Sequence, residues 1–133
     1  MRILMIGIAA VTLASCETAP EQVTRTAAAQ ATYDKMLSGK TAGREQGCLS
    51  SLRAKDMTVI DDDTILFKDG RTVYENKPLG TCLNLSNSSY ALATRNVGPQ
   101  LCRGDIANVV DTSVGITVGS CALGNFVPYR PAN

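Results

Sequence analysis

The fold is decided by the stretch MTVIDDDTILFKDGRTVYE, which occupies residues 57–75. Three runs in it are rich in β-branched and aromatic residues and therefore predict strands: 57–60, 64–68 and 71–75. The triple aspartate at 61–63 separates the first two runs, and Asp69-Gly70, a dipeptide favoured in tight hairpin turns, separates the last two. We therefore expect a three-stranded antiparallel meander.

Short strand-forming runs with turn residues between them continue from this stretch to the C-terminus. Pro78 interrupts the pattern within 76–80, and the runs after it predict further strands: 90–95, 106–111, 115–119 and 125–127. Several short strands in about 85 residues predict a mainly β fold, which is a small disulfide-stapled sandwich, roll or partial barrel.

The chain before residue 48 has a different composition, because it is rich in alanine and holds few large apolar side chains. Thr18 and Glu21 fit a capping box, which predicts one N-terminal helix over 21–37 that ends at Ser38-Gly39. A weak apolar stripe on this helix contains Val23, Ala27, Met36 and Leu37, with Tyr33 nearby. The alternative is a disordered tether, and 41–47 is expected to be a linker.

The N-terminus carries the pattern of a targeting signal. Arg2 precedes an apolar run at 3–13, whose 11 residues fall short of the roughly 20 that a membrane-spanning helix needs. The tetrad Leu13-Ala14-Ser15-Cys16 then resembles the lipobox of bacterial lipoproteins. That resemblance implies a signal peptide at 1–15 and a lipid such as palmitate on Cys16, which becomes the mature N-terminus. The alternative is an ordinary secretory signal, with Cys16 incidental or a spare disulfide partner.

Four cysteines remain when Cys16 is set aside: Cys48, Cys82, Cys102 and Cys121. An even number of cysteines in a secreted chain predicts two disulfides, but sequence alone does not choose among the three pairings. We prefer Cys82 with Cys102, because the segment between them resembles a hairpin, and Cys48 with Cys121, which would bracket the domain. A four-thiolate zinc site is the competing interpretation, although the chain has no C-x-x-C pair.

The composition excludes several classes of chemistry. The 133 residues contain no histidine, so a Ser-His-Asp triad and a histidine-ligated zinc are both ruled out. The formal net charge is +1 with both signs scattered along the chain, which gives no electrostatic footprint for nucleic acid. We therefore expect no nucleic-acid partner, and the sequence predicts no catalytic residue, cofactor site or metal site.

Three groups of residues are candidates for a functional site, each with a simpler alternative. The run Asp61-Asp62-Asp63 has the carboxylates for Ca²⁺, but adjacent strand residues point to opposite faces, so a turn is expected. The tripeptide Arg103-Gly104-Asp105, which integrins read, is also expected to be a turn. Near the C-terminus, Phe126, Tyr129 and Arg130 are a candidate recognition edge, with packing of Phe126 in the core as the alternative.

The chain also resembles a known family over roughly residues 42–131. The resemblance rests on an ordered set of short motifs: Cys48-Leu49, Ile60-Asp61-Asp62, Asp63-Thr64-Ile65-Leu66, Leu101-Cys102-Arg103-Gly104-Asp105 and Cys121. The set is similar to that of an uncharacterised family of small proteobacterial envelope proteins. The resemblance implies a secreted disulfide domain and implies no activity.

Together these features predict a lipid-anchored protein of the bacterial cell envelope that faces the periplasm, on the outer membrane rather than the inner one. The expected organisation is a signal peptide at 1–15, a lipid-anchored helix and linker at 16–47, and a β domain at 48–133. The expected partners are the membrane, through the lipid on Cys16, and an envelope protein or wall component. A binding or accessory module is the expected function. The alternatives are an inhibitor of a lysozyme or protease, and an enzyme that uses carboxylate or lysine chemistry.

Overall fold

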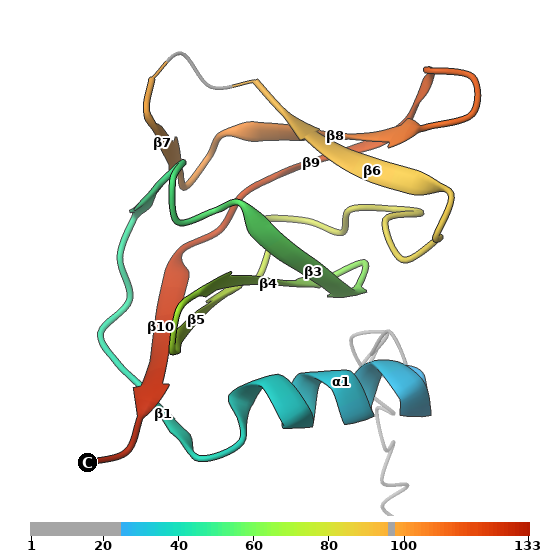
Figure 1. The fold of residues 1–133 in the computed structure, drawn as a ribbon. Coiled ribbons are helices and arrows are strands. Elements are labelled where there is room, and N and C mark those ends of the chain that lie inside the picture. Colours follow the sequence, from blue (N-terminus) through green and yellow to red (C-terminus); the bar gives the residue numbers. More distant parts are fainter. Residues whose placement is uncertain (1–24, 96–97) are drawn as a thin grey trace, which may run out of the picture.

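The computed structural model describes residues 25–95 and 98–133, which form a mainly β fold with one helix (Figure 1). The elements are α1 (Ala27–Leu37), β1 (Lys40–Ala42), β2 (Cys48–Ser50), β3 (Asp56–Asp61), β4 (Thr64–Asp69), β5 (Thr72–Asn76), β6 (Tyr90–Thr94), β7 (Gln100–Cys102), β8 (Ile106–Asp111), β9 (Thr117–Ala122) and β10 (Phe126–Pro131). The mainly β fold class expected from the sequence is confirmed.

The strands form three antiparallel sheets. The largest has five strands in the order β1-β10-β5-β4-β3, the second has three in the order β6-β8-β9, and the third is the pair β2-β7. The two larger sheets pack on each other, and α1 covers the other face of the five-stranded sheet (Figure 1). The chain passes from β9 through 123–125 directly into β10, so one extended segment joins the two larger sheets.

The strands β3, β4 and β5 are the predicted meander. Met57 lies opposite Phe67, Phe67 lies opposite Tyr74, and Gly70 turns the second hairpin with a φ of 59°, which glycine adopts without strain. All four residues 64–67 are buried, because β4 is covered on both faces. The side chain of Phe67 packs in the core between the two larger sheets, whereas the side chain of Leu66 packs against α1. Burial on both faces explains why the sequence of this strand shows no alternation of apolar and polar residues.

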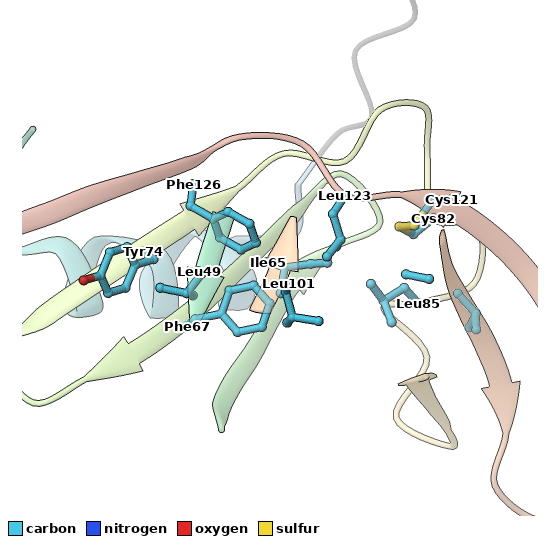
Figure 2. Close-up of a cluster of buried hydrophobic side chains, with 12 residues drawn as sticks. Leu49, Ile65, Phe67, Tyr74, Cys82, Leu85, Leu101, Cys121, Leu123 and Phe126 are labelled. Carbon is cyan, nitrogen blue, oxygen red and sulfur yellow. A yellow bond between two sulfur atoms is a disulfide. The ribbon is translucent and has the colours of Figure 1, made fainter. Parts of the chain in front are cut away.

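The main core fills the space between the two larger sheets (Figure 2). The rings of Phe67 and Phe126 lie at its centre with their centroids 5.8 Å apart, in the tilted arrangement that aromatic pairs prefer. The other buried members are Leu49, Ile65, Tyr74, Cys82, Leu85, Leu101, Ala107, Val109, Cys121 and Leu123. Packing in the core was the alternative interpretation of Phe126, and it is confirmed.

A second, smaller core lies between α1 and the five-stranded sheet. The sheet contributes Ile60, Leu66 and Val73, and the helix contributes Ala29, Tyr33, Met36 and Leu37. The described helix is therefore docked, in contrast to the tether alternative. Three of these four helical residues belong to the predicted stripe or lie beside it. Ala27, also predicted on the stripe, is exposed, and Val23 lies outside the described residues.

The helix begins later than expected. Thr26 is extended, and its hydroxyl accepts a hydrogen bond of 3.2 Å from the Ala29 N–H, so Thr26 is the N-cap. A helix over 21–37 is therefore wrong at its start, and the expected capping box at Thr18 and Glu21 lies outside the described residues. The predicted end at Ser38-Gly39 is confirmed, since Ser38 is the C-cap.

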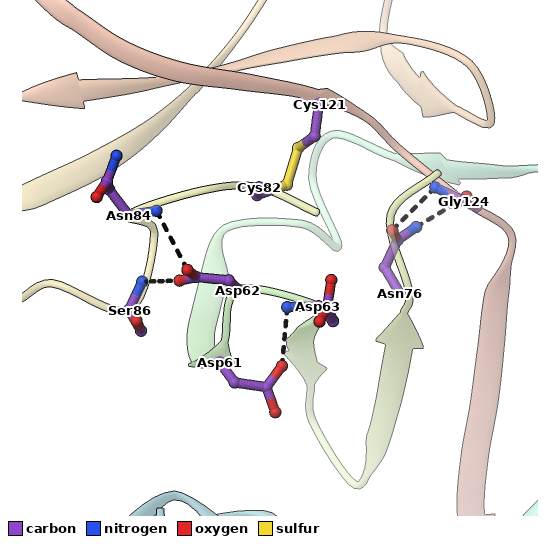
Figure 3. The surroundings of a disulfide bond; sticks show 9 residues. All are labelled: Asp61, Asp62, Asp63, Asn76, Cys82, Asn84, Ser86, Cys121 and Gly124. Atoms are coloured by element: carbon purple, nitrogen blue, oxygen red, sulfur yellow. Dashed lines mark hydrogen bonds between the residues drawn. A yellow bond between two sulfur atoms is a disulfide. The ribbon is translucent and has the colours of Figure 1, made fainter. Parts of the chain in front are cut away.

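The four cysteines of the domain form two disulfides, but the preferred pairing was wrong. The bonds join Cys48 to Cys102 and Cys82 to Cys121. Cys48 and Cys102 are direct partners in the β2-β7 pair, with their Cα atoms 4.0 Å apart. The chain from 82 to 102 is not a hairpin, because β6 pairs with β8 and the segment containing Cys82 lies against β9 (Figure 3).

The C-terminal part of the five-stranded sheet also differs from the expectation. Residues 40–42 pair with 129–131, so part of the expected linker at 41–47 is a strand. The strand β10 runs through Pro128, whose carbonyl accepts a hydrogen bond of 2.7 Å from Gly43 N–H at the point where β1 leaves the sheet. Since the N–H and C=O of one strand residue point to the same side, the missing N–H of Pro128 removes no bond to β5.

Candidate functional site

The predicted recognition edge does not form. Phe126 is fully buried, with 0% of its surface exposed. Tyr129 lies opposite Val73 in the register and is therefore on the helix-facing side of the sheet, away from Phe126. Arg130 is exposed and lines a shallow cavity of about 450 Å³ together with Arg71. Of the three predicted residues, only Arg130 is fully at the surface.

The three aspartates at 61–63 form the turn between β3 and β4, as expected, and the side chains of Asp61 and Asp62 bind different partners. Asp61 accepts a hydrogen bond of 2.6 Å from Arg25, and its other oxygen accepts one of 2.8 Å from the Asp63 N–H. Asp62 accepts from the backbone N–H groups of Asn84, at 3.2 Å, and Ser86, at 2.7 Å (Figure 3). The carboxylates thus hold the start of α1 and the loop after β5 in place.

The tripeptide at 103–105 is a turn between β7 and β8, as expected. Gly104 has a φ of 90°, and one Asp105 carboxylate oxygen accepts a hydrogen bond of 2.7 Å from the Cys102 N–H. The Asp105 carboxylate therefore stabilises its own turn.

A polar cluster beneath α1 was missed by sequence reasoning. The Tyr33 hydroxyl donates a hydrogen bond of 2.6 Å to Glu75, whose side chain is buried in β5. The Lys77 ammonium lies 3.8 Å from the other Glu75 oxygen, and the Arg25 guanidinium lies 4.4 Å from the centre of the Tyr33 ring. Glu75 shares its face of β5 with Val73, so its burial against the helix follows from strand alternation once α1 is known to dock there.

Burial raises the pKa of the Tyr33 hydroxyl well above the usual value of about 10, and the hydrogen bond to Glu75 and the Glu75 charge raise it further. The neutral hydroxyl is therefore favoured by folding. The stability that the neutral Tyr33 hydroxyl contributes is complete below the pKa that Tyr33 has in the unfolded chain. It is lost as the pH rises through the higher pKa that Tyr33 has in the folded protein.

We expect the absorbance titration of the native protein, minus that of Tyr33→Phe, to show one phenol ionising above the ordinary tyrosine value. The same difference measured in concentrated denaturant should titrate near pH 10, since the neighbours are then gone. If the native difference also titrates near pH 10, the hydroxyl is not held by Glu75.

The described strand residues on one face of the three-stranded sheet carry no charge. It is the outer face of the sheet β6-β8-β9, where the register and the alternation place Ala91, Ala93, Ile106, Asn108, Val110, Thr117, Ser120 and Ala122. Leu79 bridges Ala122 and extends one row of this set. We call these nine residues the neutral face. It lies on the side of the molecule away from α1 (Figure 1).

The hairpin between β8 and β9 extends beyond this sheet, and its end, residues 112–116, is here called the β8–β9 tip (Figure 1). Val114 and Ile116 are 65% and 57% exposed at the tip. Asp111 accepts hydrogen bonds from the Ser113 N–H, at 2.8 Å, and the Ser113 hydroxyl, at 2.6 Å, which lower the pKa of its carboxyl. Gly115 N–H also bonds to the Asp111 carbonyl at 2.8 Å.

These bonds fix the tip at its base, and a further pair joins it to the start of β6. The Thr112 N–H and hydroxyl both donate to the Ser89 carbonyl, at 3.1 Å and 2.7 Å. The tip therefore presents two branched apolar side chains on a backbone that is hydrogen-bonded on several sides. Val114 and Ile116 are two exposed apolar side chains on one braced hairpin end, and this makes the tip a candidate contact surface.

Comparison with known proteins gives no relative: no protein-family model matches the chain, and no curated protein or solved structure shows significant similarity to it. Within the described residues, no group of three or more histidine, cysteine or acidic side chains is placed to hold a metal ion. The helix of the described part is too short to cross a membrane.

Proposed function

We propose that this chain is a lipid-anchored protein of the bacterial cell envelope, attached to the outer membrane through Cys16, and that its β domain is a binding or accessory module in the periplasm. The lipobox-like tetrad at 13–16 supports the anchor. The two disulfides support a location in the periplasm, because such bonds persist in oxidising environments. They account for four of the five cysteines of the chain, and the fifth is Cys16 of the lipobox-like tetrad.

The observation that carries the binding role is the β8–β9 tip beside the neutral face. The exposed side chains of Val114 and Ile116 supply apolar contact area, and the braced backbone lowers the entropy lost on binding. The neutral face next to them presents uncharged side chains, which suits contact with a partner surface that is itself poor in charge. Both features lie away from α1, on the side opposite to the helix that begins the described chain (Figure 1).

The experiment uses full-length protein in bacterial envelopes, cross-linked and then purified by an affinity tag, alongside co-sedimentation with purified peptidoglycan. Val114→Ser combined with Ile116→Ser should lower the amount of cross-linked partner, or of protein that sediments with peptidoglycan, at least about tenfold. Truncating apolar side chains that anchor an interface costs about 2 kcal/mol of binding free energy. The fold stability should change by less than about 0.5 kcal/mol, since both side chains are exposed.

Leu52→Ser is the matched control, because Leu52 is 74% exposed and lies outside the tip and the neutral face. It should capture partners as well as the natural protein. Equal capture by the tip variant, or no capture by the natural protein in either assay, would contradict the proposal.

A second candidate function, inhibition of a lysozyme or protease, is favoured by the same tip. Rigid exposed loops on disulfide scaffolds suit insertion into an enzyme cleft. In that case the natural protein lowers the turnover of peptidoglycan by lysozyme, or of a peptide by a protease, and the tip variant does not. Capture without any effect on either enzyme favours the accessory module.

A further inference from the structure

The strand β6 is an edge whose outer side has no partner strand in the described chain. It occupies one end of the order β6-β8-β9, and its five residues, YALAT, contain no charge, no proline and no glycine. An exposed strand edge is a template for pairing with another chain, and proteins usually protect such edges with charges, bulges, short strands or covering segments.

The other edges of the two larger sheets show that protection. The strand β1 has three residues and includes Lys40. The strand β3 begins and ends with an aspartate and has an irregular register between Val59 and Asp61. The outer side of β9 is covered, because the Leu79 N–H bonds to the Ala122 carbonyl at 2.8 Å and the Asn84 side chain bonds to the Val118 carbonyl at 3.3 Å. In the described part of the chain, the residues of β6 itself have no charge, no irregular register and no covering strand. One outward group is occupied, since the Tyr90 N–H donates to the Asn87 carbonyl at 3.0 Å, and Arg95 follows the strand.

The side chains of β6 fit a second copy of the same strand. In an antiparallel pairing with Leu92 opposite itself, Ala91 lies opposite Ala93, and Tyr90 lies opposite Thr94, so no like charges meet. The same operation on β3 would place Asp56 opposite Asp61. Since Ala91 and Ala93 are exposed and small, two neighbouring sheets can approach to the strand spacing without a steric barrier from these side chains.

We propose that β6 pairs with β6 of a second copy of this chain, antiparallel about Leu92. The three strands of each copy then form one sheet of about six, and the two neutral faces lie side by side in it. This dimer is isologous and closed, so the β6 edge of each copy is paired and no further copy can add to it. The proposal rests on the strand edge and does not depend on the lipid or on the binding role of the tip.

A charge exchange tests both the contact and its register. The natural full-length protein, purified from membranes in detergent, should sediment as a dimer. Ala91→Lys combined with Ala93→Lys places lysines opposite lysines across the two-fold axis, so the dissociation constant should rise at least about tenfold. Ala91→Lys combined with Ala93→Glu places each lysine opposite a glutamate and should restore the dimer. The two variants change the same exposed positions, and matching circular dichroism spectra show that the fold is intact in both. The melting temperature should be lower for the Lys/Lys variant, because the dimer stabilises the folded chain.

Variants with one added cysteine give an independent readout. A mixture of differently tagged Ala91→Cys and Ala93→Cys chains should form a mixed disulfide dimer under mild oxidation, whereas Ser120→Cys, on the same face but on β9, should not. A monomeric natural protein, an unchanged association constant in both charge variants, or equal cross-linking from Ser120→Cys would overturn the proposal.

Discussion

Replacing Asn76 with alanine is expected to lower the free energy of unfolding by about 4 kcal/mol. Losses of this size occur when a substitution leaves buried polar groups without hydrogen-bond partners or creates a cavity in the core. Asn76 is fully buried at the end of β5, and its side chain holds the segment that joins the two larger sheets (Figure 3). Its amide nitrogen donates to the carbonyls of Gly124, at 2.8 Å, and Asn125, at 3.4 Å. Its oxygen accepts from the Gly124 N–H at 3.0 Å.

Alanine leaves these backbone groups without partners, and each buried unsatisfied group costs about 1–3 kcal/mol. The segment has little room to adjust, because a Cβ on Gly124 would overlap the carbonyl oxygen of Lys77. Urea unfolding followed by circular dichroism measures the loss. Asn108→Ala is the matched control on the neutral face and should change stability by less than about 0.5 kcal/mol. A loss below about 1 kcal/mol for Asn76→Ala would show that the joining segment does not depend on this side chain.

Removing the Cys82–Cys121 disulfide by a double substitution to alanine is expected to cost about 4–5 kcal/mol. Closing a loop with a sequence separation of 39 residues gives about 4 kcal/mol of loop-closure entropy in the unfolded chain. The rest comes from packing, because Cys82 and Cys121 are 0% and 7% exposed within the main core.

The Cys48–Cys102 disulfide closes a longer separation of 54 residues, but the extra entropy amounts to only about 0.3 kcal/mol. Cys48 and Cys102 are half-buried, so the packing loss on their removal is smaller. Thermal and urea unfolding of the two double-alanine variants should therefore rank Cys82–Cys121 as the more costly bond to lose. The opposite ranking would mean that loop length, and not burial, decides the contribution of each disulfide.

The central meander could be predicted from sequence because its signals are local. The hairpin at Asp69-Gly70 and the aspartate turn at 61–63 each lie between runs of strand-forming residues, and both turns form where expected. The helix end at Ser38-Gly39 is equally local. The helix start was misplaced because the preference for a threonine N-cap is met at more than one position, and the described helix is capped by Thr26.

Non-local features could not be predicted in the same way. The strands β1, β2 and β7 have three residues each, too few to show a periodicity, and β2-β7 pairing decides which cysteine meets Cys48. The bond between Tyr33 and Glu75 joins residues 42 apart, and it depends on where α1 docks. The recognition edge at 126–130 failed because alternation along β10 sends Phe126 and Tyr129 to opposite faces.

The neutral face and the β8–β9 tip were also missed, although a signal exists in the sequence. The predicted strand at 115–119 begins two residues before β9, and this shift placed Ile116 inside a strand instead of at an exposed hairpin end. Correct strand limits would have shown that the outward positions of 106–122 carry no charge.

The most direct test of an anchored, two-disulfide envelope protein is the intact mass of the chain from its native membrane fraction, alkylated before and after reduction. We predict a chain that begins at Cys16 with acyl groups attached, and four thiols that react only after reduction, with peptides linking Cys48 to Cys102 and Cys82 to Cys121. A chain without lipid whose thiols react before reduction would contradict both the anchor and the compartment.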